Sequence, residues 1–346
     1  MSEVDLQDDF FNPLRDNYEG FDEWFIRKAS AGEFAYTYYS EEKLLDFLYL
    51  KQEEDTLEMD ELTLPKAKRL KVGTFKIERR GTSRGERFMK KILDTAIQGD
   101  YPEVYVTMFD DTEELLHLRH FFEKYGFGEI GHISHSNGRK EVVLSRMMND
   151  RTGNIISDYP YVDLTRSNKY VLSIHPIYHT KLFSDSMLSN ESFDILKDVS
   201  ETNSIYKIYI CWMPDVENLR TGDHIIIYRT NDQRGAAYYR SVATSLCTVL
   251  EQKTNKDFSN VDEFVSYCNK YSVFNERELR KWFFGKTCYV IKLLYNVAFN
   301  KRVIRKDMIE RVGIPADMYW GFFRLSNNQF IELLKLGKAD ERYFSY

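Results

Sequence analysis

Between residues 70 and 97 the pattern of apolar and polar positions changes twice, and each change predicts a new element. Residues 70–77 (LKVGTFKI) carry apolar side chains bounded by charge, as a half-buried strand does. Residues 78–85 (ERRGTSRG) form a polar stretch with two glycines and three arginines, which predicts a tight turn. Residues 86–97 then place apolar side chains at helical spacing, with charges on the opposite face.

The same alternation of strands and helices continues to residue 147. Residues 103–109 predict a strand, and residues 112–125 predict a helix with one apolar side. Residues 129–133 and 140–147 predict a hairpin, because Asn137-Gly138 between them favours a tight turn. The first half is therefore expected to be an α/β domain with a mixed sheet flanked by helices.

Upstream of these elements, we expect two helices, within residues 21–31 and 40–49. Residues 53–71 between them and the strand at 70–77 predict either a loop or an extended hairpin.

The second half shows a different pattern, with several short strands and a helix at its end. Residues 150–168, which contain Gly, Pro, Asp and Asn without periodicity, predict a linker between domains 1–149 and 169–346. The strands and the final helix are expected at residues 169–174, 206–212, 218–229, 241–251, 319–325 and 327–336.

Composition adds limits to this picture. The chain of 346 residues is long enough for two domains, and it contains no apolar run of the ~20 residues that a membrane helix needs. Its start is acidic rather than basic and apolar, so we expect a cytoplasmic protein without a membrane partner. The cysteines have no C-x-x-C spacing, and His175 and His179 have no carboxylate or cysteine at ligand spacing, so no metal site is expected.

Charge is distributed unevenly along the chain. Residues 1–61 hold 18 Asp and Glu against five Lys and Arg, although the net charge of the whole chain is only −6. An acidic stretch of this kind is most often a solvated face. The other interpretation is that it borders a site for a cationic substrate.

A strand that enters a helix through a basic, glycine-containing loop directs backbone N–H groups and the positive end of the helix at one point. This arrangement can hold a phosphate or pyrophosphate, although an ordinary polar turn would have a similar sequence. The loop does not match the P-loop or the dinucleotide-binding pattern. Residues 80–85 do fit [QR]-x-x-G-x-[GA], and residues 121–127 are similar to F-Y-E-K-x-G-F. Together these segments resemble the GNAT superfamily of N-acetyltransferases.

This resemblance implies acetyl-CoA as the cofactor. The strand would pair with the pantetheine arm, and the loop and first helical turn would hold the pyrophosphate, with Ser83 at a position where the family usually has glycine. The implied cofactor-binding residues are Phe75, Ile77, Arg79, Arg80, Gly81, Thr82, Ser83, Arg84, Gly85, Glu86 and Arg87. The resemblance also implies that the first two helices border the acceptor site, and that pairing of edge strands makes a homodimer one option.

Catalytic groups are less clearly indicated. The family often uses a tyrosine as general acid, but Phe122 occupies that position, and Tyr125 is the nearest hydroxyl. Glu78, at the end of the strand, is the expected general base, unless it is only a surface partner of an arginine. The predicted catalytic residues are therefore Glu78 and Tyr125.

The second half resembles the PUA-like superfamily of small β-barrels, which includes ASCH and EVE modules. Ser173-Ile174-His175-Pro176 looks like the start of an ASCH domain, and Gly222-Asp223 before an apolar strand is similar to another element of that superfamily. The ASCH pattern G-x-K-x-x-E-x-R is absent. The resemblance implies RNA as a partner, with tRNA as one candidate.

Residues 270–311 are the expected RNA-binding part, because they hold 11 Lys and Arg against four Asp and Glu, interleaved with aromatic residues. In the alternative interpretation, the aromatic residues are core and the cations cover a basic helical extension. The predicted RNA-binding residues are Arg277, Arg280, Lys281, Lys301, Arg302, Arg305 and Lys306.

Two classes of function follow from the sequence. The first is an acetyl-CoA-dependent N-acetyltransferase that acts on RNA or an RNA-bound amine, such as the amine of aminoacyl-tRNA, in the manner of a toxin with an antitoxin partner. The second is an RNA-binding regulator whose GNAT domain senses CoA but is catalytically silent. A protein N-acetyltransferase is a further alternative.

Overall fold

The structure of the protein is a computed structural model that describes residues 1–78, 83–165, 167–183 and 204–345. The chain divides into two compact units, Met1–Asp158 and Tyr159–Tyr346. The division falls inside segment 150–168, the predicted linker. Each unit has its own sheet and its own hydrophobic core.

Unit 1 contains a six-stranded mixed sheet with the order β1-β2-β3-β4-β6-β5. Strands β3 and β4 are parallel, and the other neighbours are antiparallel. The elements are η1 (Asp9–Phe11), α1 (Asn12–Asn17), α2 (Phe21–Ser30), β1 (Ala35–Ser40), β2 (Lys43–Glu58), β3 (Thr63–Ile77), α3 (Arg84–Gln98), β4 (Glu103–Met108), α4 (Glu113–Lys124), β5 (Gly128–Ser134) and β6 (Lys140–Met147). This order confirms the predicted α/β fold.

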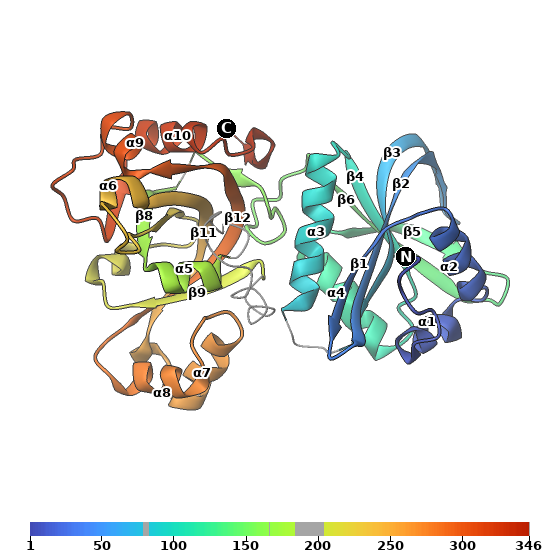
Figure 1. Ribbon diagram of the computed structural model, residues 1–346. Helices are drawn as coiled ribbons and strands as arrows, with labels where there is room; N and C mark the ends of the chain where they lie inside the picture. The colour runs from blue at the N-terminus through green and yellow to red at the C-terminus, as the bar shows by residue number, and fades with distance from the viewer. Residues whose placement is uncertain (79–82, 166, 184–203, 346) are drawn as a thin grey trace. The chain divides into compact units, whose positions relative to one another are not determined.

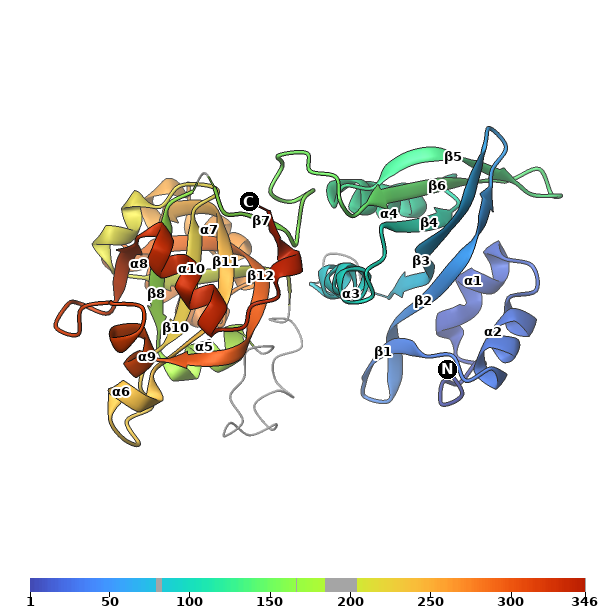
Figure 2. The same cartoon turned by 90° about the horizontal axis from the view of Figure 1, so that it is seen from above.

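The sheet of unit 1 lies between two layers of helices. Helices α1 and α2 lie on one face, and α3 and α4 lie on the other (Figure 2). On the first face, Phe11 and Phe25 pack on the ring of Phe47 in β2, with centroids 5.3 and 5.9 Å away. The sheet therefore has a covered core on both sides near β2.

The helix predicted at residues 40–49 is wrong, because most of this segment belongs to β2. The strand is buried on both faces, so residues 44–49 form a nearly continuous apolar run without the alternation of a half-buried strand. Such a run cannot be distinguished from a buried helix by periodicity alone. Residues 53–71 form the extended hairpin of β2 and β3 rather than a loop.

Unit 2 contains a second six-stranded mixed sheet, with the order β13-β8-β10-β11-β12-β9. The strands of this sheet are β8 (Lys169–Ile174), β9 (Tyr206–Cys211), β10 (His224–Arg229), β11 (Val242–Thr254), β12 (Tyr289–Ile304) and β13 (Phe322–Leu325). Strands β7 (Val162–Asp163) and β14 (Phe344–Ser345) pair with each other in a separate two-stranded sheet. The helices are α5 (Pro176–Leu182), η4 (Pro214–Asn218), α6 (Ala237–Arg240), η5 (Asn255–Asp257), α7 (Val261–Asn269), α8 (Glu276–Phe284), α9 (Arg305–Glu310), α10 (Asn327–Leu336) and η6 (Glu341–Tyr343). The predicted succession of short strands and the final helix is confirmed.

Strand β12 departs from the interpretation in which residues 270–311 form a basic helical extension, because residues 289–304 are a strand. The strand lies between β11 and β9 in the sheet. One face of this part of the sheet packs into the main core through Leu293, and the other packs against α7 and α8 through Val290. Burial on both faces again removes the alternation that would have indicated a strand.

The helices of unit 2 gather at two places. Helices α7 and α8 lie at one end of the unit, and α9 and α10 lie at the opposite end (Figure 1). No helix within the described residues combines the length and apolar character that crossing a bilayer requires.

All four cysteines of the chain lie in unit 2, and all are buried free thiols: Cys211, Cys247, Cys268 and Cys288. Burial raises the pKa of each thiol, to about 12 for Cys211 and Cys268 and to about 11 for Cys288. These thiols are therefore protonated and unreactive in the folded protein.

Candidate functional site

Strands β3 and β4 separate halfway along their length. Their ladder pairs residues 69–72 of β3 with residues 103–106 of β4. Beyond this point β3 continues to Ile77 and β4 to Met108, and no ladder pair joins these described ends. The separation leaves backbone donors and acceptors on the facing edges of the two strands without ladder partners, so an extended, amide-containing ligand arm can pair there.

A β-bulge marks the point of separation. The register of β2 and β3 shifts between Tyr49/Thr74 and Leu50/Val72, so Gly73 is the extra residue. A Cβ atom at Gly73 would lie 2.7 Å from Cδ1 of Tyr49, which is a closer approach than side chains make. Glycine is therefore required for the ring of Tyr49 to pack across the strand where the two strands separate.

Behind the gap, an aromatic cluster fixes β3 to α3 and α4. The ring of Phe75 lies 5.7 Å from Phe88, 5.8 Å from Phe121 and 5.4 Å from Phe122, measured between centroids. The side chain of Phe75 is thus held in the core on the face of α3 and α4. Only the backbone of Phe75 is then available for the predicted contact with the cofactor.

The first turn of α3 follows the loop that the sequence identified as a pyrophosphate cradle. Arg79, Arg80, Gly81 and Thr82 lie outside the described residues. Ser83 is the N-cap of α3 and has φ −76°, so a serine in place of the family's glycine needs no left-handed backbone. A Cβ atom at Gly85 would lie 3.4 Å from Phe121 and 3.5 Å from Ile77, so this turn packs closely against β3.

A buried ion pair ties α3 to β2. Nη1 of Arg84 lies 3.3 Å from Oδ1 of Asp46, and both side chains are less than a tenth exposed. Burial raises the pKa of Asp46 to about 6, although Arg84 and Arg87 lower it. The guanidinium of Arg84 also lies 5.7 Å from the ring centre of Tyr38 on β1. Arg84 therefore fixes the position of the turn, while its predicted contact with pyrophosphate remains a prediction.

The opposite face of the sheet carries a second group of polar side chains near the end of β4. Glu141 on β6 is only 7% exposed, and its Oε2 lies 3.1 Å from Nε2 of His135, the residue after β5. Tyr18, which follows α1, is partly buried there, and desolvation, reinforced by Glu141, raises the pKa of its hydroxyl. This group combines a carboxylate, an imidazole and a phenol next to the gap between β3 and β4.

Phe109, the first residue after β4, holds this group together. Its ring centroid lies 5.3 Å from Tyr18 and 5.4 Å from His135, and the guanidinium carbon of Arg139 lies 3.7 Å from its centre. Arg139 also donates to Asn17 Oδ1 at 3.2 Å, so α1 and the β5–β6 hairpin meet around Phe109. We call Tyr18, Phe109, His135, Arg139 and Glu141 the Phe109 cluster.

The two predicted catalytic residues have different environments. Glu78 is exposed at the end of β3, and its Oε1 lies 3.7 Å from Nζ of Lys43. The side chain of Tyr125 is fully buried, with its ring 5.3 Å from Phe121 on the face of α3 and α4. The structure thus does not bring Glu78 and Tyr125 together, and their catalytic roles remain predictions.

Sequence reasoning did not identify the Phe109 cluster or Asp46. The only signal for Asp46 is a single acid within the apolar run LLDFLYL of residues 44–50. The members of the Phe109 cluster come from residues 18, 109 and 135–141, which only the folded sheet brings together. Among the described residues, no three His, Cys, Asp or Glu side chains are arranged to hold a metal ion.

The predicted RNA-binding residues form two groups rather than one surface. Arg277, Arg280 and Lys281 belong to α8, whereas Lys301, Arg302, Arg305 and Lys306 lie in or near α9, at the opposite end of unit 2 (Figure 1).

Several of these cations already have partners. Arg280 contacts Asp262 at 2.7 Å and Glu276 at 2.9 Å. Arg305 lies 4.3 Å from the ring centre of Trp320, so its guanidinium is engaged within unit 2.

No family model and no curated protein matches the chain. Among solved structures, the chain is similar to an ASCH protein of Zymomonas mobilis and to a point mutant of that protein, both at 12% identity. The mutant aligns over 49% of this chain and 95% of its own, with a TM-score of 0.34, and the parent protein over 49% and 94%, with a TM-score of 0.33.

The chain is also similar to N-acetyltransferases of known structure. An aminoglycoside 6'-acetyltransferase type Ii is 15% identical over 41% of this chain and 89% of its own, with a TM-score of 0.30. Naa50 of Arabidopsis thaliana, solved with the bisubstrate analogue CoA-Ac-MVNAL, is 21% identical over 36% of this chain and 80% of its own, with a TM-score of 0.28.

Proposed function

We propose that unit 1 is an acetyl-CoA-dependent N-acetyltransferase and that its acceptor is an amine carried by RNA. The observation that carries the proposal is the separation of β3 from β4 directly before the α3 turn, in a segment whose sequence resembles the GNAT cofactor loop. The described residues fit the cofactor. Two strand edges lack ladder partners, and the bulge beside them contains Gly73, where the ring of Tyr49 leaves no room for a side chain.

Each part of this segment has a task in holding the cofactor. Backbone N–H groups of the α3 turn, with the preceding arginines, bind the pyrophosphate. The edge of residues 74–77 pairs with the pantetheine arm. When bound, acetyl-CoA supplies an acetyl group activated as a thioester. Backbone N–H groups on the unpaired edge of β3 would donate to the carbonyl oxygen of a bound thioester and would stabilise negative charge there.

The Phe109 cluster supplies a base for the amine. Because Glu141 accepts a hydrogen bond from Nε2 of His135, Nδ1 of that ring keeps its lone pair. Nδ1 would take a proton from the amine nitrogen, and that nitrogen would form the amide bond as the C–S bond of the thioester breaks, so that CoA leaves as a thiolate and is protonated by solvent. Glu141 positions the imidazole, Phe109 packs against it, and Tyr18 packs against Phe109.

An amine attached to RNA is favoured by the distribution of charge. Residues 1–61, which contain α1 and α2, hold 18 Asp and Glu against five Lys and Arg, and this excess of negative charge favours a cationic group. In unit 2, Arg277 and Lys281 on α8 are exposed and can contact phosphates. The α-amine of aminoacyl-tRNA has both properties.

A second function has specific support. Phe122 replaces the tyrosine expected of the family, and Tyr125 is buried in the core. A unit of this kind could bind CoA without transferring its acyl group, and the protein would then be an RNA-binding regulator.

Transfer of radiolabel from acetyl-CoA to a total cellular extract, followed by separation of RNA, aminoacyl-tRNA and protein, tests these proposals. We expect label in RNA in an alkali-labile form, and we expect Gly85→Glu to abolish both CoA binding and labelling. Label in protein alone would refute the RNA-linked acceptor, and binding of CoA without any labelling would favour the silent regulator.

A further inference from the structure

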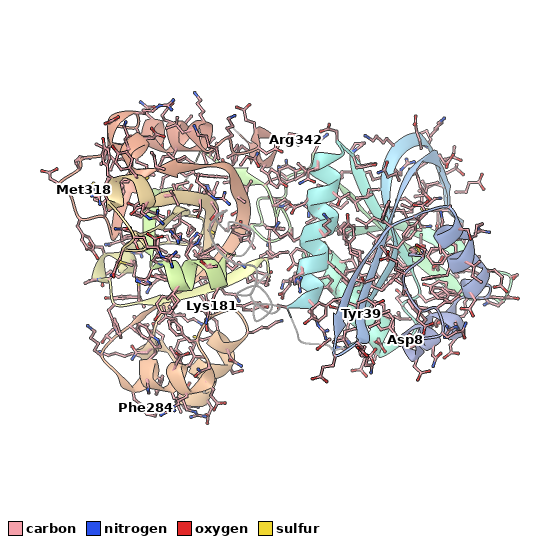
Figure 3. All side chains as sticks on the ribbon, viewed as in Figure 1. Asp8, Tyr39, Lys181, Phe284, Met318 and Arg342 are labelled. Carbon is pink, nitrogen blue, oxygen red and sulfur yellow. The ribbon has the colours of Figure 1, made fainter. Side chains whose placement is uncertain are left out.

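Unit 2 exposes several large aromatic side chains near α8. Trp212, the residue after β9, is 51% exposed, and Phe284, the last residue of α8, is 73% exposed. Figure 3 labels Phe284, which lies on α8 at the end of the unit. Exposed rings that lie together leave apolar surface in contact with solvent, which is typical of a binding site.

The exposed rings continue a row of partly buried ones. The centroids of Trp212 and Trp282 are 4.1 Å apart, with an angle of 31° between the planes. Trp282 lies 5.5 Å from Phe274, which lies 5.3 Å from Tyr178 on α5. Trp212 is therefore supported from one side by a packed ring, and it forms a rigid flat platform.

Cations surround this platform. Nζ of Lys286 lies 4.7 Å from the ring centre of Trp212. Arg277 and Lys281 are exposed on α8 at a spacing of four residues, which places them on one face of the helix together with Phe284. Within the described residues these three cations have no ion pair.

The acidic residues of α8 are used within the protein. Glu276 pairs with Arg280 at 2.9 Å, and Glu278 accepts a hydrogen bond from the backbone N–H of Asn275 in a capping box. The charge that α8 presents to an outside partner is therefore carried by Arg277 and Lys281, which suits an anionic partner.

We propose that Trp212, Trp282, Phe284, Arg277, Lys281 and Lys286, the α8 surface, bind single-stranded RNA. Unpaired bases stack on Trp212 and Phe284, and the neighbouring phosphates contact the three cations. The inference rests on the proposed RNA-linked acceptor and deepens it, because it places the RNA at α8 and not at α9. Paired bases cannot reach the rings, so double-stranded RNA binds more weakly.

Fluorescence anisotropy with a labelled single-stranded RNA of about 12 nucleotides tests the proposal. We expect Trp212→Ala to weaken binding about tenfold or more. Lys281→Glu should weaken binding and reduce the slope of log affinity against log salt by about one or more. A duplex RNA of the same length should bind at least tenfold more weakly than the single strand.

Matched control variants lie on the same unit. Tyr239→Ala removes a ring that is 60% exposed on α6, and Lys301→Glu reverses an exposed cation at the other end of the unit, so both should keep the affinity within about twofold. Circular dichroism and thermal unfolding of each variant show whether it folds. If Trp212→Ala does not fold, Phe284→Ala, which changes a more exposed ring, replaces it.

Three outcomes would overturn the inference: unchanged affinity in folded Trp212 and Lys281 variants, equal binding of duplex and single strand, or loss of affinity in Lys301→Glu alone. A concentration-dependent dimer that Trp212→Ala abolishes would also overturn it, because a second copy of the chain would then cover the α8 surface. Acetylation of a small free polyamine is measured in parallel. If the unaltered protein acetylated neither this polyamine nor an RNA-linked amine, the proposed enzyme would be refuted and the RNA-binding result would remain.

Discussion

At the scale of single residues, the Phe109 cluster contains a histidine whose proposed role as a base depends on its neighbours. His135 is an ordinary surface histidine until the buried carboxylate of Glu141 fixes which ring nitrogen carries the proton. His132, three residues earlier on β5, contacts Glu61 at 2.9 Å and, within the described residues, has no ring contact with Phe109 and no hydrogen bond or ion pair with Glu141. The two histidines therefore provide a matched comparison.

We predict that His135→Gln lowers kcat about 100-fold or more with little change in KM, because the variant keeps a similar shape but loses the proton acceptor. His132→Gln should leave both constants unchanged. Steady-state kinetics with an amine acceptor measure this difference. Equal effects of the two substitutions would show that His135 has no special part in proton transfer.

Asp46 gives a prediction about pH and stability. Its pKa in the folded protein is about 6, against 3.8 for the free side chain, so the folded state holds this proton to a higher pH. The contribution of Asp46 to the free energy of unfolding is therefore complete below about pH 4 and is lost as the pH rises through 6. A pKa difference of about 2 corresponds to about 3 kcal/mol.

Asp46→Asn should remove this pH dependence. The unfolding free energy of the unaltered protein minus that of the variant should fall by about 3 kcal/mol between pH 4 and pH 7. Hydrogen exchange of β2 peptides at the two pH values measures it. A difference that stays constant with pH would mean that Arg84 keeps Asp46 ionised throughout.

At the scale of elements, the bulge at Gly73 links local packing to the site. Because a Cβ atom there would meet the ring of Tyr49 at 2.7 Å, Gly73→Ala should move β3 or the ring. We predict a loss of about 1–3 kcal/mol in stability and weaker CoA binding. Gly128→Ala, where no atom lies within 4 Å of the added Cβ, should change neither.

Urea unfolding and isothermal titration with CoA check both glycine variants. If Gly73→Ala destabilised the protein but bound CoA normally, the bulge would serve packing alone. Normal stability with normal binding would mean that Tyr49 moves aside freely.

The elements also show what the sequence could predict and what it could not. Strands and helices with one exposed face, such as β3 and α3, can be predicted from periodicity. Their buried positions are apolar and their exposed positions are polar, and these positions recur at the period of a strand or of a helix. Strands β2 and β12 are covered on both faces, so their sequences contain no such contrast. The cofactor loop was recognisable because its residues are adjacent in the chain, whereas the Phe109 cluster is assembled from distant segments.

At the scale of the whole molecule, the proposals give each unit a separate task, catalysis in unit 1 and RNA capture in unit 2. We predict that Trp212→Ala lowers kcat/KM for an RNA-linked amine about tenfold, through KM, because the base platform is lost. The same variant should acetylate a small free amine at the normal rate. Comparison of the two acceptors with one enzyme preparation measures this.

An equal loss with both acceptors would contradict the division of tasks, since Trp212 would then affect the chemistry itself. Tyr239→Ala serves again as the control, because its ring is exposed to a similar degree and lies outside the α8 surface.

The four buried cysteines of unit 2 allow its unfolding to be measured without an added label. Their protonated thiols are shielded from alkylating reagents in the folded unit, and unit 1 contains no cysteine to add background. Each opening of unit 2 therefore leaves a permanent mass increase, while unfolding confined to unit 1 leaves none. Intact-protein mass spectrometry after a timed pulse of iodoacetamide can therefore distinguish unfolding of unit 2 from unfolding of unit 1 in the same sample.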